Sequence, residues 1–273
     1  MRVKAYLSLF RVQALADLQY RLAALAGATT SIFWGLVEIV IFTVFYTYSE
    51  RAGAGIPAGL SLNQVVTYVW LAQCLFSIQP LALDSEIQAK IENGNVSLDL
   101  ARPMDLYAYW FAKIAAGRLT PLCWRGLAVL AAGIVMPAGY RLGPPASWAN
   151  LLWTLAAAAS ALFLAAAFGC LLSSVRLSVD WGSGPVFMLI LVSQVLSGSH
   201  LPLQLWPKAW QRWLFLQPFA GYLDIPCRMY LGSMPLEQAA AAIALQWLWI
   251  VVFVIVGRLL MARQLARIVV QGG

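Results

Sequence analysis

The sequence predicts an all-α protein that crosses a membrane several times. Hydrophobic residues make up 62% of its 273 residues and only 11% are charged, whereas soluble domains carry about 25% charged residues. The mean hydropathy of +0.76 agrees with this reading. The apolar residues also fall in continuous runs, long enough for helices that cross the roughly 30 Å hydrocarbon core. A membrane β-barrel would instead alternate in segments of about ten residues.

Six apolar runs predict six membrane-spanning helices. They lie near residues 22–48, 62–83, 108–136, 149–175, 181–198 and 235–257. The third run contains Arg118 and Arg125, so the pattern does not fix where this helix enters the membrane. The connecting loops are too short to fold separately, and we expect residues 1–273 to form a single transmembrane domain.

Residues 1–20 are expected to form a helix in the headgroup region before the first span. Their apolar residues share one side of a helical wheel and their polar residues lie on another, as in interfacial helices. The alternative is an extended start of the first span. Arg11, Asp17 and Arg21 interrupt any apolar core of a signal peptide, so we expect no cleavage.

Basic residues place both termini in the cytoplasm, because short cytoplasmic loops are enriched in Lys and Arg. With the N-terminus inside, the inner side holds Arg2, Lys4, Arg11, Arg21, Lys90, Arg102, Lys113, Arg176, Arg258, Arg263 and Arg267. The outer side holds Arg51, Arg141, Lys208, Arg212 and Arg228. The net charge of +7 is thus mainly an orientation signal. We expect no nucleic-acid binding, which needs a basic face on a soluble module.

Residues 84–105 form a charged segment between the second and third runs, on the predicted cytoplasmic side. Ile87 and Ile91 are spaced i, i+4 among charged residues, which indicates a short amphipathic helix over 84–92. A linker needs only about two to eight residues. A solvated linker is one reading of this segment. A docking surface for a cytoplasmic partner explains its length and its paired isoleucines better.

The ends of this short helix are marked in the sequence. Asp84 or Ser85 can cap its first turn. Gly94, within "NGN", tolerates the left-handed conformation that ends helices. Pro103 disfavours helix at Arg102, so the next helix is expected to begin soon after.

Residues 199–230 are apolar but broken by prolines. Irregular backbone cannot face lipid, and tryptophan prefers the membrane interface, so we expect short helices forming a re-entrant hairpin at the outer face. They can serve as an aromatic anchor belt, as an outer gate over an exit path, or as both. The candidate gate residues are Pro202, Trp206, Pro207, Trp210, Pro218, Phe219 and Pro226.

Few polar residues interrupt the apolar runs. Glu38 lies in mid-span, where an ionisable group indicates function by default. It can face a translocation pathway, pair with Arg118 or Arg125, or be held protonated. Arg176 and Asp180 flank a short inner turn that is either a second, smaller partner contact or a helix cap.

The sequence shows no set of residues typical of a catalytic site, a metal site or a disulfide framework. His200 is the only histidine, and no Ser-His-Asp set or carboxylate pair shares a face, so we expect the chain not to be an enzyme. The four cysteines lack CxxC spacing, so we expect neither a metal site nor a disulfide framework.

Two stretches resemble ABC transporter permeases of the type 2 export class. "IENGNVSLDLARPMDLYAYWFAK" is similar to the stretch after their second span, with matches around it at Glu86, Ile87, Ile91, Gly94, Leu100, Arg102 and Pro103. "SGSHLPLQLWPKAWQRWLFLQPFAGYLDIPCRMYLG" is similar to the segment before their last span. Its matches are Ser197, Gly198, Pro202, Leu203, Trp206, Pro207, Trp210, Pro218, Phe219, Pro226, Tyr230, Leu231 and Gly232.

The resemblance implies a permease of the bacterial cytoplasmic membrane that exports a lipid, drug, antibiotic or peptide-like substrate. It implies that 84–92 is a coupling helix on a separate ATPase subunit, present in two copies, beside a second permease chain, identical or paralogous. The expected coupling residues are Asp84, Glu86, Ile87, Lys90, Ile91, Glu92, Gly94, Arg102 and Pro103. No GxxxxGK(S/T) occurs here, so ATP and Mg²⁺ are expected on the partner and no cofactor on this chain.

The alternative function is an ion- or proton-coupled secondary transporter with Glu38 as the titrating group. Such transporters are usually built from inverted repeats with helices broken near the midplane. No convincing repeat is visible in this sequence, which favours the permease.

Overall fold

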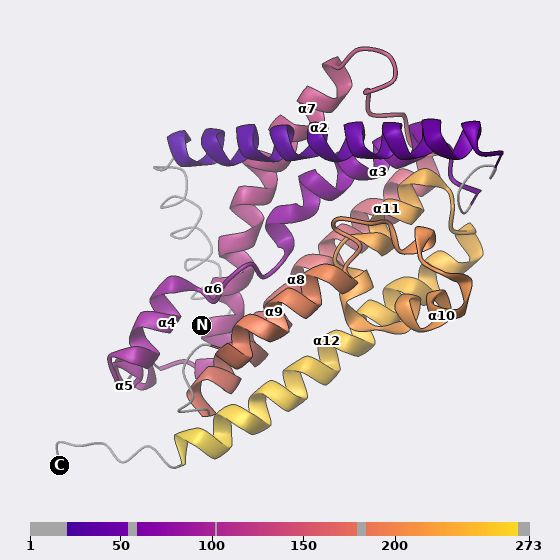
Figure 1. Ribbon diagram of the computed structural model, residues 1–273. Helices are drawn as coiled ribbons and strands as arrows, with labels where there is room; N and C mark the ends of the chain where they lie inside the picture. The colour runs from indigo at the N-terminus through magenta and orange to yellow at the C-terminus, as the bar shows by residue number, and fades with distance from the viewer. Residues whose placement is uncertain (1–20, 54–58, 102, 179–183, 267–273) are drawn as a thin grey trace.

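The computed structural model describes residues 21–53, 59–101, 103–178 and 184–266, and within these ranges it is helical without strands (Figure 1). The all-α expectation is confirmed for this part of the chain. The predicted interfacial helix at 1–20, together with Arg102 and Asp180, lies outside the described residues.

Within the described ranges, four helical stretches are long and apolar enough to cross a membrane. The candidate spans are Ala26–Arg51 within α2 (Arg21–Arg51), Leu106–Val135, Trp148–Leu177 within α8 (Trp148–Ser178), and α12 (Leu236–Leu265). Two shorter apolar helices occupy the second and fifth predicted runs. These are Leu62–Ile78, formed by α3 (Leu62–Leu75) and η2 (Phe76–Ile78), and α9 (Gly184–Leu196).

The third stretch changes its winding in the middle. It consists of α6 (Leu106–Pro121), a π-helical turn η3 (Leu122–Gly126) and α7 (Leu127–Val135). Pro121 cannot donate a backbone hydrogen bond, which favours a local irregularity at this point. A Cβ at Gly126 would lie 3.0 Å from Cys74 Sγ, so glycine lets α3 approach this turn closely.

The fourth stretch, α8, forms the centre of the molecule and packs most extensively against α12. Two-thirds of its most apolar window is buried. Ala157, Ala161 and Ala165 are completely buried, and small residues of this kind allow close helix approach in lipid. The sequence left open whether the small residues pack within the chain or between chains, and these residues pack within it.

The proline-rich segment folds into short helices, as its sequence predicts. They are η4 (Leu203–Leu205), α10 (Lys208–Leu216), η5 (Pro218–Gly221) and α11 (Asp224–Leu231). Pro207 precedes α10, Pro218 begins η5, and Pro226 lies in the first turn of α11, positions where a missing amide hydrogen costs least. Of these helices, α11 packs against α3 and α8.

The charged segment folds into α4 (Ser85–Glu92) and α5 (Val96–Leu100). Figure 1 shows both at one end of the molecule, at the lower left, whereas α10 lies at the right. The second of these helices, α5, was not anticipated from the sequence.

Candidate functional site

The boundaries of α4 are set by local side-chain chemistry. The Asp84 carboxylate accepts hydrogen bonds from the backbone amides of Glu86 and Ile87, at 3.1 and 3.0 Å. Gly94 has a φ of +70°, the left-handed conformation that ends a helix. Asp105 caps the start of α6 by accepting a hydrogen bond from the amide of Ala108. The predicted cap and both boundaries are confirmed.

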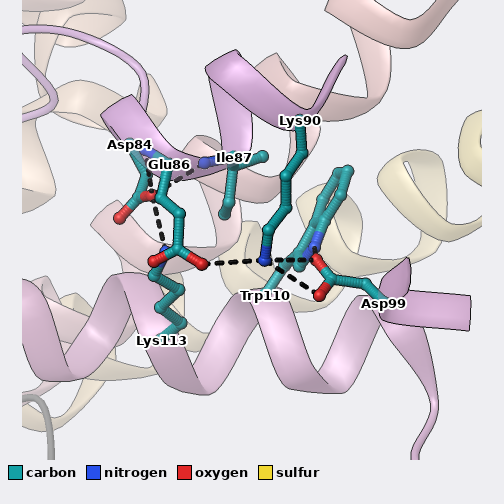
Figure 2. A network of polar contacts seen from close by, with 7 residues as sticks. All are labelled: Asp84, Glu86, Ile87, Lys90, Asp99, Trp110 and Lys113. Atoms are coloured by element: carbon teal, nitrogen blue, oxygen red, sulfur yellow. Dashed lines mark hydrogen bonds and ion pairs between the residues drawn. The ribbon is translucent and has the colours of Figure 1, made fainter. Parts of the chain in front are cut away.

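Lys113 of α6 ties the start of α4 to the third stretch (Figure 2). Its ammonium lies 3.0 Å from an Asp84 carboxylate oxygen and 2.5 Å from one of Glu86. Hydrogen bonds from Lys113, and then from Lys90, lower the pKa of Glu86 to about 2. Sequence reasoning assigned Lys113 only to membrane orientation. Its signal was a cation in an apolar helix, which needs a partner.

Lys90 of α4 makes a second tie, to α5 and α6. Its ammonium lies 2.7 Å from Glu86 and 2.9 Å from Asp99, and Trp110 donates its indole N–H to the same Asp99 carboxylate (Figure 2). Burial lowers the pKa of Lys90, but its hydrogen bonds to Glu86 and Asp99 raise it on balance. Neither Asp99 nor Trp110 was recognised from the sequence, because their contacts depend on α5 folding back.

The isoleucines of α4 face the interior, so the paired isoleucines do not themselves form an exposed docking surface. Ile87 is only 1% exposed and belongs to a core cluster with Trp110 and Ile114, against which Ile91 also packs. The amphipathic pattern correctly predicted an apolar face, but the chain itself covers that face. The exposed residues of α4 are Ser85, Glu86, Ala89 and Glu92, and the exposed Asn93 follows as its C-cap.

A third contact joins α4 to α8. Arg176, near the end of α8, lies 3.7 Å from the Glu92 carboxylate. The fold therefore places this residue, predicted as a second inner contact, next to α4. Pro103 is exposed between α5 and α6. The coupling roles predicted for these residues stay predictions.

A cavity of about 790 Å³, here called the α2 cavity, lies along α2 beside α3 and the loop at 200–205. Aromatic residues such as Trp34, Phe42 and Phe45 line it, with Glu38 and Arg125 among them. Glu38 therefore lines a cavity, and its role in a translocation pathway stays a prediction.

Glu38 pairs with neither Arg118 nor Arg125, which corrects a second alternative. Its carboxylate accepts a hydrogen bond from Gln73 at 3.3 Å, and His200 Nδ1 lies 3.3 Å away. Arg125 donates through Nε to the Ser31 hydroxyl at 2.9 Å. The His200 side chain is 64% exposed, and its hydrogen bond with Glu38 raises the pKa of His200.

Arg118, the other arginine proposed as a partner, caps the end of the second apolar helix instead. Its guanidinium donates to the carbonyl oxygens of Ile78 and Gln79, at 3.0 and 2.6 Å. These carbonyls lie where the helix ends and lack helical partners.

The proline-rich segment is anchored by a buried polar cluster. Arg228 Nε lies 2.6 Å from Asp224 Oδ2, and both residues belong to α11. Tyr68 of α3 donates to the Gly198 carbonyl at 3.0 Å and contacts Asp224 at 3.5 Å. This cluster holds the segment on α3, whereas sequence reasoning used Arg228 only as an orientation signal.

The candidate gate residues take different places. Trp206 and Trp210 lie side by side with ring centroids 6.2 Å apart, and Trp210 is exposed. Phe219 packs inward against Phe168, at 5.1 Å between centroids. Pro202 is buried just before η4. The exposed indole of Trp210 fits an anchor belt, whereas Phe219 packs inward, and the gate role of these residues stays a prediction.

No group of His, Cys, Asp or Glu in the described ranges could hold a metal ion. Searches among curated proteins and among solved structures gave no significant match. The model of the family described as "ABC-2 family transporter protein" matches residues 32–272, which include α3 to α12 and most of α2. The chain therefore belongs to the ABC-2 family of transporter proteins.

Proposed function

We propose that this chain is the transmembrane permease subunit of an ATP-driven exporter, and that α4 is the helix on which a separate ATPase subunit docks. Membership of the ABC-2 family implies an ATPase partner. The observation that carries the assignment to α4 is its two-sided construction. One side is fixed to the chain by Ile87, Lys90 and Lys113, and the other is exposed and polar.

This construction suits the transmission of force. An eight-residue helix is not stable alone in water, so its position depends on the ties to the rest of the chain. Movement of a docked ATPase would reach α6 through Lys113 and α8 through the contact of Arg176 with Glu92. The permease would then change from an inward-open to an outward-open state. Such a change is a switch between two discrete packing arrangements of the helices.

The proposed topology has six spans with both termini in the cytoplasm. Leu62–Ile78 is at the lower end of the length that can cross a bilayer. The helix α9 is shorter, and the residues just before it lie outside the described ranges. In this topology α4 is cytoplasmic, and the helices of residues 199–230 form an outer hairpin. The complete transporter would contain two ATPase copies and a second permease chain, identical or paralogous, in a bacterial cytoplasmic membrane.

The test is affinity purification from the native membrane, followed by mass spectrometry and an ATPase assay. A P-loop ATPase should co-purify with the unchanged chain and be lost with Ala89→Arg, which places a bulky charge on the exposed face of α4. The matched control is Ala52→Arg, at an exposed position after α2. Equal recovery of the ATPase with both variants would refute docking on α4. Ile87→Asp is unsuitable, because it would place a charge in the core.

A proton-coupled secondary transporter is the second candidate, favoured by one observation. Glu38 and His200 meet at the wall of the α2 cavity, and a paired acid and imidazole can exchange a proton. If no P-loop ATPase co-purifies, and transport follows a proton gradient and stops with Glu38→Gln, this second function replaces the first.

A further inference from the structure

A second hollow, of about 290 Å³, lies beside the first residue of the charged segment. This α4 pocket is lined by Ser77 and Gln79 after α3, by Arg118 and Arg125 of the third stretch, and by Asp84. Arg125 also lines the α2 cavity, so one guanidinium borders both spaces.

The α4 pocket gathers hydrogen-bond donors that lack acceptors. Ser77 Oγ, Gln79 Nε2 and Arg118 Nε are buried without a hydrogen-bond partner, and Gln79 is only 1% exposed. All three atoms carry a hydrogen to donate. Buried donors are normally satisfied, and three unsatisfied ones on residues of one pocket indicate a missing acceptor.

Neither arginine forms a direct ion pair with a carboxylate among the residues that the structure describes, although the charge of Asp84 acts on Arg118. Arg118 bonds carbonyl oxygens, and Arg125 bonds the Ser31 hydroxyl and lies 5.4 Å from the centre of the Phe76 ring. Asp84 is the carboxylate on the pocket wall, but Lys113 and two backbone amides already engage it. Cations within a membrane protein usually pair with an anion, so the α4 pocket has an excess of positive charge.

The neighbouring α2 cavity offers a surface of a different kind. It extends along α2 from Thr30 to Phe45, which corresponds to about 22 Å of helix at 1.5 Å per residue. Its walls include Trp34 and Phe42, and its one carboxylate, Glu38, is already satisfied by Gln73 and His200. The cavity therefore suits an apolar chain better than a second charged group.

We infer that the two spaces together bind an amphiphile with a phosphate or carboxylate headgroup. The headgroup lies in the α4 pocket, where Ser77, Gln79, Arg118 and Arg125 donate to it. The apolar chain passes Arg125 and lies in the α2 cavity. The headgroup end is next to α4, so in the proposed topology the ligand has the orientation of a lipid from the inner leaflet. The inner-leaflet orientation, and the further step that this ligand is the transported substrate, rest on the proposed function.

The test uses the purified full chain in dodecyl maltoside and counts bound molecules by native mass spectrometry during titration. The probes are dodecyl phosphate, dodecyltrimethylammonium and inorganic phosphate. We expect one dodecyl phosphate per chain and an affinity reduced about tenfold or more by Arg125→Gln, as for loss of a charged hydrogen bond. Arg141→Gln, which removes an exposed arginine, should leave the affinity unchanged.

A second variant separates binding from folding. Ser77→Ala removes a hydroxyl that has no partner, so it should leave the melting temperature unchanged and still weaken dodecyl phosphate binding. If Arg125→Gln and Ser77→Ala both bind dodecyl phosphate as tightly as the unchanged chain does, the site is overturned. Equally tight binding of inorganic phosphate would show a soluble anion as the source and overturn the amphiphile. Preferential binding of dodecyltrimethylammonium would overturn the anionic headgroup.

These measurements require no ATPase. The amphiphile site can therefore fail while an ATPase still co-purifies through α4, and it can succeed although no ATPase is found.

Discussion

Lys113 Nζ lies 2.5 Å from Glu86 Oε2, so an ion pair joins the third apolar stretch directly to α4. Replacing the ammonium by Lys113→Met would leave Asp84 and Glu86 without this partner. We expect hydrogen exchange of the α4 amides to accelerate about tenfold or more, because hydrogen bonds to charged groups each contribute about 1.5–3 kcal/mol. Lys208→Met, at an exposed position on α10, is the matched control. Unchanged exchange in Lys113→Met would show that hydrophobic packing alone holds α4.

The buried cluster on α11 predicts two variants of unequal effect. Tyr68→Phe removes one hydrogen bond to Gly198 and should reduce the free energy of unfolding by about 0.5–1.5 kcal/mol. Arg228→Met leaves the fully buried Asp224 without its cation and should cost about 3–5 kcal/mol. Both are measured by thermal unfolding in detergent. Equal costs would contradict the buried ion pair.

Two glycines predict opposite effects of the same substitution. A Cβ at Gly221 would lie 2.6 Å from Leu164 Cδ2, so Gly221→Ala should destabilise the protein by about 1–3 kcal/mol through overpacking. Nothing lies within 4 Å of a Cβ at Gly117, which is inside α6. Gly117→Ala should stabilise by about 0.4–1 kcal/mol, because alanine favours the helix. Calorimetry of the two variants measures both signs.

The contact between Glu38 and His200 predicts a pH-dependent link between α2 and the loop before η4. Because the pKa of His200 is raised above its usual 6.5 by the hydrogen bond with Glu38, the contact is fully present below pH 6.5. It is lost as the pH rises through the higher pKa of the folded state. His200 is the only histidine, so selective ¹⁵N-histidine labelling gives one imidazole to titrate by NMR. Glu38→Gln should lower the observed pKa toward 6.5, and an unchanged value would show that the two groups do not interact.

Local features of the fold were predictable because they depend on neighbouring residues. The apolar runs, the cap by Asp84, the stop at Gly94 and the short helices at Pro207 and Pro218 follow from period, capping and backbone restriction. Each of these rules acts over a few residues.

Long-range contacts were not predictable in the same way. The pattern of α4 showed that Ile87 belongs to an apolar face, but nothing local reveals whether that face meets the same chain or another protein. Glu38 pairs with His200, 162 positions away, rather than with an arginine of the third stretch. Lys113 could be identified as a cation in need of a partner, but its carboxylates became known only from the packing of α4 on α6.

Because α4 has an anchored side and an exposed side, its exposed residues could be transferred from one permease to another. Ile87 and Lys90 hold the helix in place, whereas Ser85 and Ala89 are exposed, so these two sets can vary independently. Glu86 belongs to both sets, because it is exposed and also pairs with Lys113. Transferring only Ser85, Ala89, Glu92 and Asn93 into another permease should carry partner choice with them, apart from the contact of Glu92 with Arg176. The recipient would keep its own anchoring residues and fold unchanged. The exposed face of α4 would then be a partner-recognition surface that can be exchanged while the anchoring of the helix stays the same.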